Sequence, residues 1–153
     1  MRAFKVTILF LALLCTLGCT DKTVVYHSYH HIPSYEWNKN DTLLFNIAIP
    51  DSLCSYRIYL LVRTLNSYAY KNLTLNIEYP IGDTITHKKD IPFQVSPEYN
   101  DEYTAKWGGL YQAIEPVYDK YVEKPDTLRF RVNHQMKDDV LKGISDIGIL
   151  IER

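Results

Sequence analysis

The segment 56-YRIYLLVRTL-65 is the most strand-like stretch of the chain. Side chains alternate between the two faces of a β-strand. One face of this segment carries an unbroken apolar row, made of Tyr56, Ile58, Leu60 and Val62. The other face also carries apolar residues between positions 58 and 62, so neither face is expected to meet water. The segment therefore predicts a central strand of a β-sandwich.

Shorter segments of similar character flank it. We expect strands at residues 24–32, 42–49, 72–79, 84–87, 91–95, 127–133 and 146–152, weaker edge strands at 110–114 and 117–122, and one helical turn at 137–141. Pro, Gly, Asn and Asp separate these segments, and helical periodicity is almost absent. Many short strands with this punctuation are typical of an antiparallel sandwich. We expect an all-β fold, an antiparallel β-sandwich of jelly-roll-like type, whose last strand pairs inside a sheet.

The N-terminal segment MRAFKVTILFLALLCTLGC has the organisation of an export signal. Arg2 and Lys5 precede an apolar run at 6–14, which is shorter than the roughly 20 residues of a transmembrane helix but fits the apolar core of a signal peptide. Gly18 before Cys19 matches a bacterial lipoprotein signal, cut before Cys19 with lipid (palmitate) added to its thiol. The alternatives are an ordinary signal peptide with an incidental cysteine, or a weak membrane anchor.

This interpretation divides the chain into a signal peptide (1–18), a lipidated tether (19–23) and a single β-sandwich domain (24–153). Loss of Arg2 and Lys5 leaves 15 of the 17 basic residues against 18 acidic ones, a net charge of −3. No basic patch is evident, so we expect no nucleic-acid partner. A hydrophobic content of 46% argues against disorder.

Motifs for catalysis or cofactor binding are missing from the sequence. It has no Gly-rich phosphate loop, no CxxC pair, no HExxH and no GxSxG. His27 and His31 would lie about 13 Å apart along one strand, too far to share a metal ion. Cys54 stands in a turn-like stretch without a neighbouring base, and we expect a partly buried structural thiol. We therefore expect no enzyme activity, no cofactor and no metal.

The lipoprotein signal and three later parts of the chain, in order over nearly its whole length, resemble the GldH family, the gliding motility lipoproteins of Bacteroidetes. The C-terminal segment 134–153, HQMKDDVLKGISDIGILIER, is similar to the family's His-x-Met-basic, Leu-x-Gly-Ile-x-Asp-aliphatic-Gly and final Ile-Glu-basic pattern. Trp37 followed by Asp41 and Phe45 agrees with it. So does Arg63 followed by 68-YAYKNL-73. The stretch 99–121 departs from the family's Gly-rich pattern and keeps only 107-WGG-109.

The resemblance implies a cell-envelope lipoprotein associated with the gliding machinery, without catalytic residues. Relatives occur in bacteria that do not glide, so a role in envelope assembly or in lipoprotein handling stays open. Expected partners are the membrane, through lipid on Cys19, and other envelope or motility proteins. Asp21 is the only acid of the tether, whereas an acid-rich run would indicate surface export, so we expect an outer-membrane anchor facing the periplasm.

The expected contact surfaces are the loops around Trp37, Tyr68, Tyr70 and Trp107. The alternative function is a glycan-binding sandwich module, in which exposed Trp and Tyr side chains stack on sugars. Burial of the two tryptophans separates these hypotheses. Buried rings would rule out the glycan hypothesis, whereas exposed rings along one concave face would favour it.

An Asp-Ser/Thr-aliphatic tripeptide recurs and resembles the O-glycosylation acceptor pattern of exported Bacteroidetes proteins. The hydroxyl residues concerned are Thr42, Ser52, Thr84 and Thr127. An Asp in a turn followed by the β-branched start of a strand produces the same tripeptide. Glycosylation and a plain turn are therefore both open at these positions.

Overall fold

The computed structural model describes residues 23–51, 53–81, 85–95 and 104–153. Within these ranges no helix is long and apolar enough to cross a membrane. The elements are β1 (Val24–His31), η1 (Pro33–Tyr35), β2 (Glu36–Asn38), β3 (Leu43–Ile49), β4 (Cys54–Leu65), β5 (Asn72–Ile81), β6 (Ile85–Gln94), β7 (Thr104–Trp107), β8 (Leu110–Val122), β9 (Asp126–His134), β10 (Val140–Lys142) and β11 (Ile144–Glu152).

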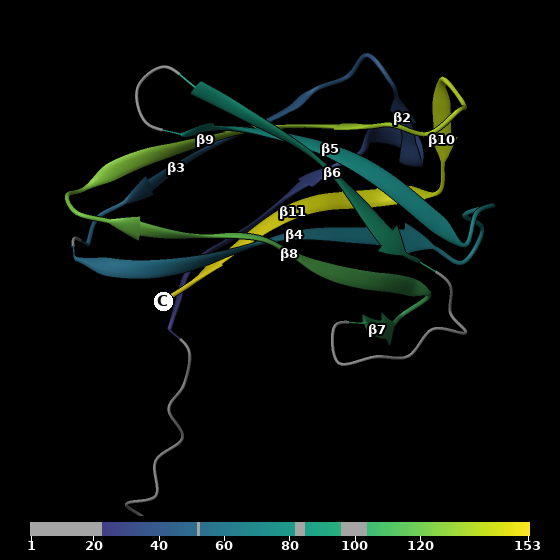
Figure 1. Ribbon diagram of the computed structural model, residues 1–153. Coiled ribbons are helices and arrows are strands. Elements are labelled where there is room, and N and C mark those ends of the chain that lie inside the picture. Colours follow the sequence, from purple (N-terminus) through teal and green to yellow (C-terminus); the bar gives the residue numbers. More distant parts are fainter. Residues whose placement is uncertain (1–22, 52, 82–84, 96–103) are drawn as a thin grey trace, which may run out of the picture.

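These strands form two antiparallel layers (Figure 1). One layer is a five-stranded sheet with the order β1-β11-β4-β8-β7, and the other is a four-stranded sheet with the order β3-β9-β5-β6. A small sheet of β2 and β10 lies beside them. Apolar side chains from the inner faces of both sheets join in one core. The antiparallel sandwich expected from the sequence is therefore confirmed.

The strand pairs are nested like those of a hairpin folded over on itself. β1 pairs with β11, β3 with β9, β4 with β8, and β5 with β6. Alternate pairs fall in opposite sheets, which is the arrangement of a jelly roll. The last strand, β11, lies between β1 and β4, as the isoleucine-rich face of the C-terminal segment predicts.

The central strand β4 is buried on both of its faces. Ile58, Leu60 and Val62 point into the core between the sheets and are at most 1% exposed. Tyr59 and Leu61 point to the outer face of the sheet and are nevertheless buried. The apolar residues on both faces of 56–65 therefore identified the central strand correctly.

Two long strands were each predicted as two short ones. The expected edge strands at 110–114 and 117–122 are a single strand, β8, which lies between β4 and β7. A bulge opposite Ile58 and Tyr59 accommodates Pro116, whose missing N–H would otherwise interrupt the ladder. The expected strands at 84–87 and 91–95 fall in the single strand β6, whose charged middle suits its place at the sheet edge.

The expected helical turn at 137–141 is wrong. Residues 140–142 form β10, which pairs with β2 so that Leu141 lies opposite Trp37. Leu141 and Trp37 are both only 1% exposed, so this small sheet closes one side of the core. The two segments are short and distant in sequence, so local sequence patterns do not reveal that they pair.

β1 covers most of the strand expected at residues 24–32, with a bulge near its start. Beyond this bulge, the His30 ring stands edge-on to the core residue Phe45, with ring centroids 4.5 Å apart. His27 and His31 are exposed. The bulge explains why the neighbouring residues Val25 and Tyr26 both pack against the core.

Gly148 makes room for an aromatic ring on the outer face of the five-stranded sheet. It lies in β11 opposite Tyr29 of β1 and Leu61 of β4. A Cβ atom at Gly148 would lie 2.6 Å from Cδ1 of Tyr29 and 2.8 Å from the Ser28 carbonyl oxygen. The absence of a side chain at this position therefore lets the Tyr29 ring lie against the sheet.

Gly148→Ala is expected to destabilise the fold by about 1–3 kcal/mol, the usual cost of overpacking. Chemical denaturation monitored by circular dichroism measures this loss. Tyr29→Ala removes the ring that the new methyl group meets, so the double variant should lose less than the sum of the single losses. Strictly additive losses would contradict the proposed clash.

Candidate functional site

The sandwich has two chemically different ends. β1 begins and β11 ends at one of them, where the turns β3–β4 and β8–β9 also lie; we call it the tether end. The opposite end, called the distal end, carries η1, the loop 66–71, the β2–β10 sheet and the turn between β7 and β8. Because β4 has 12 residues, these ends are about 40 Å apart.

The distal end presents a cluster of partly exposed apolar and aromatic side chains. Tyr35, Tyr70 and Val140 are 42%, 38% and 38% exposed. The rings of Tyr68 and Tyr70 meet at 5.7 Å, and the Tyr70 hydroxyl donates a hydrogen bond to the Asp138 carboxylate. This hydrogen bond raises the pKa of Tyr70. The tyrosines are thus held in place while their rings remain partly accessible.

Gly143 joins the segments that carry this cluster. Its N–H donates to the carbonyl of Tyr35 at 2.7 Å, and its carbonyl accepts from the N–H of Leu65 at 2.8 Å. Its φ of +91° suits glycine, and an added Cβ atom would lie 3.0 Å from backbone atoms of Tyr68. A glycine is required here for η1, the end of β4 and the Tyr68 loop to meet.

The loops expected to make contacts lie together at the distal end, but their side chains differ in how far they are exposed. Trp37 is 1% exposed, and its indole N–H donates to the carbonyl of Asp41 at 3.0 Å. Its ring is therefore part of the core and does not serve as a surface platform. The backbone of Trp107 pairs with Leu110 beside Leu65, and its side chain lies outside what the structure describes. Burial of Trp37 removes one of the two tryptophan platforms on which the glycan hypothesis rests.

A polar constellation lies on the outer face of the five-stranded sheet. The guanidinium carbon of Arg63 stands 3.7 Å above the Tyr29 ring, a cation–π contact. Gln112 Oε1 accepts hydrogen bonds from the Tyr29 hydroxyl and from Arg63 Nε, each at 2.9 Å. Burial is the main cause of the raised pKa of Tyr29. This constellation ties β1, β4 and β8 together across the sheet.

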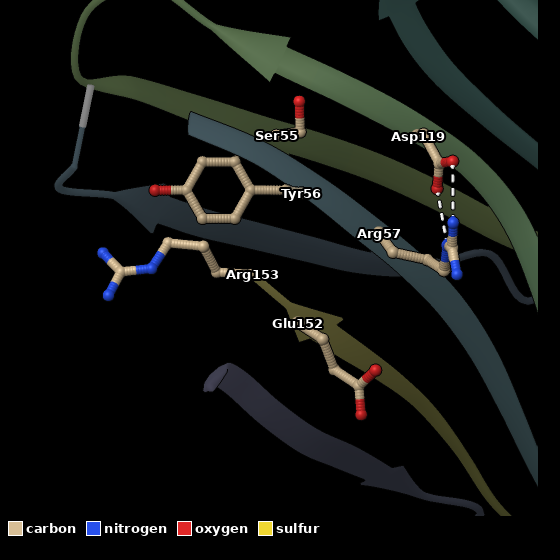
Figure 2. A pocket seen from close by; sticks show the side chains of 6 residues that line it. All are labelled: Ser55, Tyr56, Arg57, Asp119, Glu152 and Arg153. Carbon is tan, nitrogen blue, oxygen red and sulfur yellow. Dashed lines mark hydrogen bonds and ion pairs between the residues drawn. The ribbon is translucent and has the colours of Figure 1, made fainter. Parts of the chain in front are cut away.

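A hollow of about 260 Å³ lies at the tether end (Figure 2). Its lining comprises Ser55, Tyr56, Arg57, Asp119, Glu152 and Arg153. Arg57 and Asp119 form a two-pronged ion pair at 2.9 and 3.2 Å, which raises the pKa of Arg57 and lowers that of Asp119. The lining of the hollow therefore contains equal numbers of guanidinium and carboxylate groups, two of each.

In the part of the chain that the structure describes, potential metal-ligating side chains are dispersed. No three His, Cys, Asp or Glu side chains in this part of the chain are placed to hold a metal ion. The Cys54 thiol is half-buried and forms no disulfide in the described part of the chain, in line with the partly buried thiol expected. Cys19 lies outside the described residues, so its lipidation stays a prediction.

The glycosylation prediction also stays open. Thr42 and Thr127 are exposed, as an acceptor must be, whereas Ser52 and Thr84 lie outside the described residues. The N–H of Thr127 donates to Asp126 Oδ1 at 2.7 Å, so at this position the tripeptide also works as a turn.

Sequence reasoning missed several residues that organise the two ends. Gly143, Asp138, Arg57 and Asp119 were not singled out as site residues. Their partners are 62 or more positions away, as with Tyr70–Asp138 and Arg57–Asp119. The Gly within the family-like C-terminal pattern was the one available signal, and it pointed to Gly143.

Comparison with known proteins gives one family and full-length relatives. Residues 24–151 match the family model described as GldH lipoprotein. The chain is 28% identical to a gliding motility lipoprotein GldH homolog of Christiangramia forsetii, over 99% of this chain and 96% of the relative. It is 24% identical to the gliding motility lipoprotein GldH of Flavobacterium johnsoniae, over 100% and 99%.

His134 opens the family-like C-terminal segment and is completely buried. Its ring meets Trp37 at 5.3 Å in an edge-on arrangement. Neither of its ring nitrogens has a hydrogen-bond partner among the described residues. Burial lowers the pKa of His134, so the folded protein keeps this imidazole neutral.

We expect stability to fall on acidification because of His134. The unfolded chain protonates this histidine near its ordinary pKa of about 6.5, whereas the folded state resists protonation. The unfolded state therefore binds more protons below that pH, and the free energy of unfolding decreases as pH drops from about 7 to about 5. Urea denaturation across this range tests the effect.

His134→Leu should flatten this part of the pH dependence, because it removes the buried titrating group. His27→Asn, at an exposed position of β1, serves as the matched control and should leave the slope unchanged. An unchanged slope in His134→Leu would show that other groups cause the acid loss.

Proposed function

The chain belongs to the GldH lipoprotein family, and on that premise we propose that it is a lipid-anchored envelope protein that works through protein contacts. The relatives it matches are named gliding motility lipoproteins. We place it in the gliding machinery or, in a bacterium that does not glide, in envelope assembly. The anchor in this proposal is lipid on Cys19.

The distal cluster is the observation that carries the contact role. Tyrosine is enriched where proteins bind one another, because a rigid ring offers contact area and its hydroxyl offers a hydrogen bond. Tyr35, Tyr68, Tyr70 and Val140 bring such groups together on three segments fixed at Gly143. A pre-ordered surface loses little conformational entropy on binding.

We further propose that the anchor holds the domain at the periplasmic face of the outer membrane. The tether carries one acid, Asp21, next to Lys22. It therefore lacks the acid-rich run expected of a surface-exported lipoprotein.

Cys19→Ala is expected to abolish lipid attachment and to release the protein from membranes. Fractionation of native cells followed by immunoblotting measures the loss. Cys54→Ala is the matched control, because it removes the domain's own thiol and should leave the protein in the membrane fraction. Retention of Cys19→Ala in membranes would contradict the lipid anchor.

Photo-crosslinking in the native envelope tests the distal surface. A photoreactive residue at Tyr70 or Val140 should give discrete crosslinks to other envelope proteins. Leu44, which is 53% exposed on β3, provides a control position on the flank of the sandwich that is more exposed than Tyr70 or Val140. Crosslinks of equal yield from Leu44 would remove the distal cluster from the proposal.

A further inference from the structure

Three of the exposed apolar or aromatic side chains gather at the tether end. Leu53, Tyr121 and Val24 are 71%, 56% and 54% exposed, the three highest values among the large hydrophobic residues that the structure describes. Their neighbours Val122 and Val25 contribute to the core or pack against it. The two strand residues therefore point away from the core by ordinary alternation.

The position of Leu53 is costly for a leucine. It lies in the β3–β4 turn, directly before β4, and its φ of +57° lies in the left-handed region, which L-residues other than Asn and Asp seldom adopt. Its N–H donates to the Val122 carbonyl at 2.7 Å, which fixes it beside the end of β8. A polar residue would serve this turn better, so folding alone does not account for an exposed leucine here.

The length of chain before Val24 limits what can cover this end. Residues 19–23 span at most about 18 Å when fully extended. A lipid on Cys19 therefore keeps the tether end close to the bilayer in every orientation of the domain. The distal end can lie about 40 Å further away, given the length of β4.

Charged side chains at this end are largely paired with one another. Arg57 pairs with Asp119, Arg153 with Asp51, and Lys120 with Asp126, at 2.9, 3.0 and 2.9 Å. Ion pairs of this kind leave little net positive charge to attract anionic lipids. Contact with a bilayer would therefore depend on the apolar side chains. Leucine can enter the acyl boundary, and tyrosine suits the headgroup region.

We propose that the tether end is a membrane-contact surface, in which Leu53, Tyr121 and Val24 enter the bilayer interface beside the lipid anchor. This inference rests on the proposed lipidation of Cys19 and adds a second, side-chain contact to it. The contact orients the domain, with the distal cluster directed away from the membrane.

Tryptophan reporters in the full lipidated protein test the proposal. Leu53→Trp and Tyr121→Trp place a reporter at the tether end, and Val140→Trp places one at the distal end. In vesicles of phosphatidylcholine brominated on its acyl chains, the tether-end reporters should be quenched far more strongly than the distal one, after subtraction of the signal from Trp37 and Trp107. Equal quenching at both ends, or none at the tether end, would overturn the proposal.

A second variant separates membrane contact from folding. Leu53→Asn keeps the turn, because asparagine tolerates a positive φ, so the thermal midpoint in detergent should be unchanged or higher. In the Tyr121→Trp protein, Leu53→Asn should weaken quenching, whereas Leu44→Asn on β3 should not. Full quenching with Leu53→Asn would contradict the role of Leu53.

Flotation distinguishes this inference from the proposed anchor. A protein that floats with the vesicles but shows no tether-end quenching keeps its anchor and overturns the side-chain contact. A protein that does not float overturns both. Quenching that requires phosphatidylglycerol and disappears at high salt would show an electrostatic contact, and would also overturn the apolar one.

Discussion

The nested antiparallel pairing of four strand pairs is the constraint on which this fold depends. It joins residues as distant as Val24 and Glu152, so most of the chain must be in place before the outermost pair can close. Such long-range contacts are entropically expensive to form. The core between the two sheets compensates for this cost, because each sheet turns one apolar face to the other. The same pairing brings the start of β1 and the end of β11 together at one end of the sandwich.

The C-terminal segment that resembles the family pattern is the strand that closes this roll. β11 lies between β1 and β4, and its flanking glycine, Gly143, fixes the distal loops. Its internal glycine, Gly148, makes room for the ring of Tyr29, which lies under the guanidinium of Arg63. Tyr29 and Arg63 both donate hydrogen bonds to Gln112, so the contact joins β1, β4 and β8. Packing thus explains this part of the sequence pattern. The two glycines occupy positions where a side chain would meet another strand or loop.

Strand alternation predicted the main strands because each has one face in the core. It failed where the residues of a segment suggest one structure and contacts with distant segments impose another. Pro116 lies between the two segments predicted at 110–114 and 117–122, but the bulge opposite Ile58 and Tyr59 absorbs it. The Val117 carbonyl also accepts a hydrogen bond from Lys89 of the other sheet at 3.0 Å. The β2–β10 pair could not be predicted from either segment alone. It forms only when the fold brings the segment after β1 close to the segment after β9. Trp37 illustrates the same limit for sites: a tryptophan in a polar loop suggested a contact surface, whereas its pairing partner Leu141 places it in the core.

The separation of the two ends gives a physical reason for a rigid sandwich in a tethered protein. With lipid on Cys19, diffusion is confined to a membrane surface, and the length of β4 sets the greatest height of the distal cluster above it at roughly 40 Å plus the short tether. A partner anchored in the same membrane, or reaching it from the opposite side, would then meet Tyr35, Tyr70 and Val140 at a restricted height and at raised effective concentration. A flexible domain would spread that height over many values. If the proposed function holds, the ion pairs and bonded glycines at both ends would act on it through geometry, by keeping the contact surface at a defined distance from the anchor.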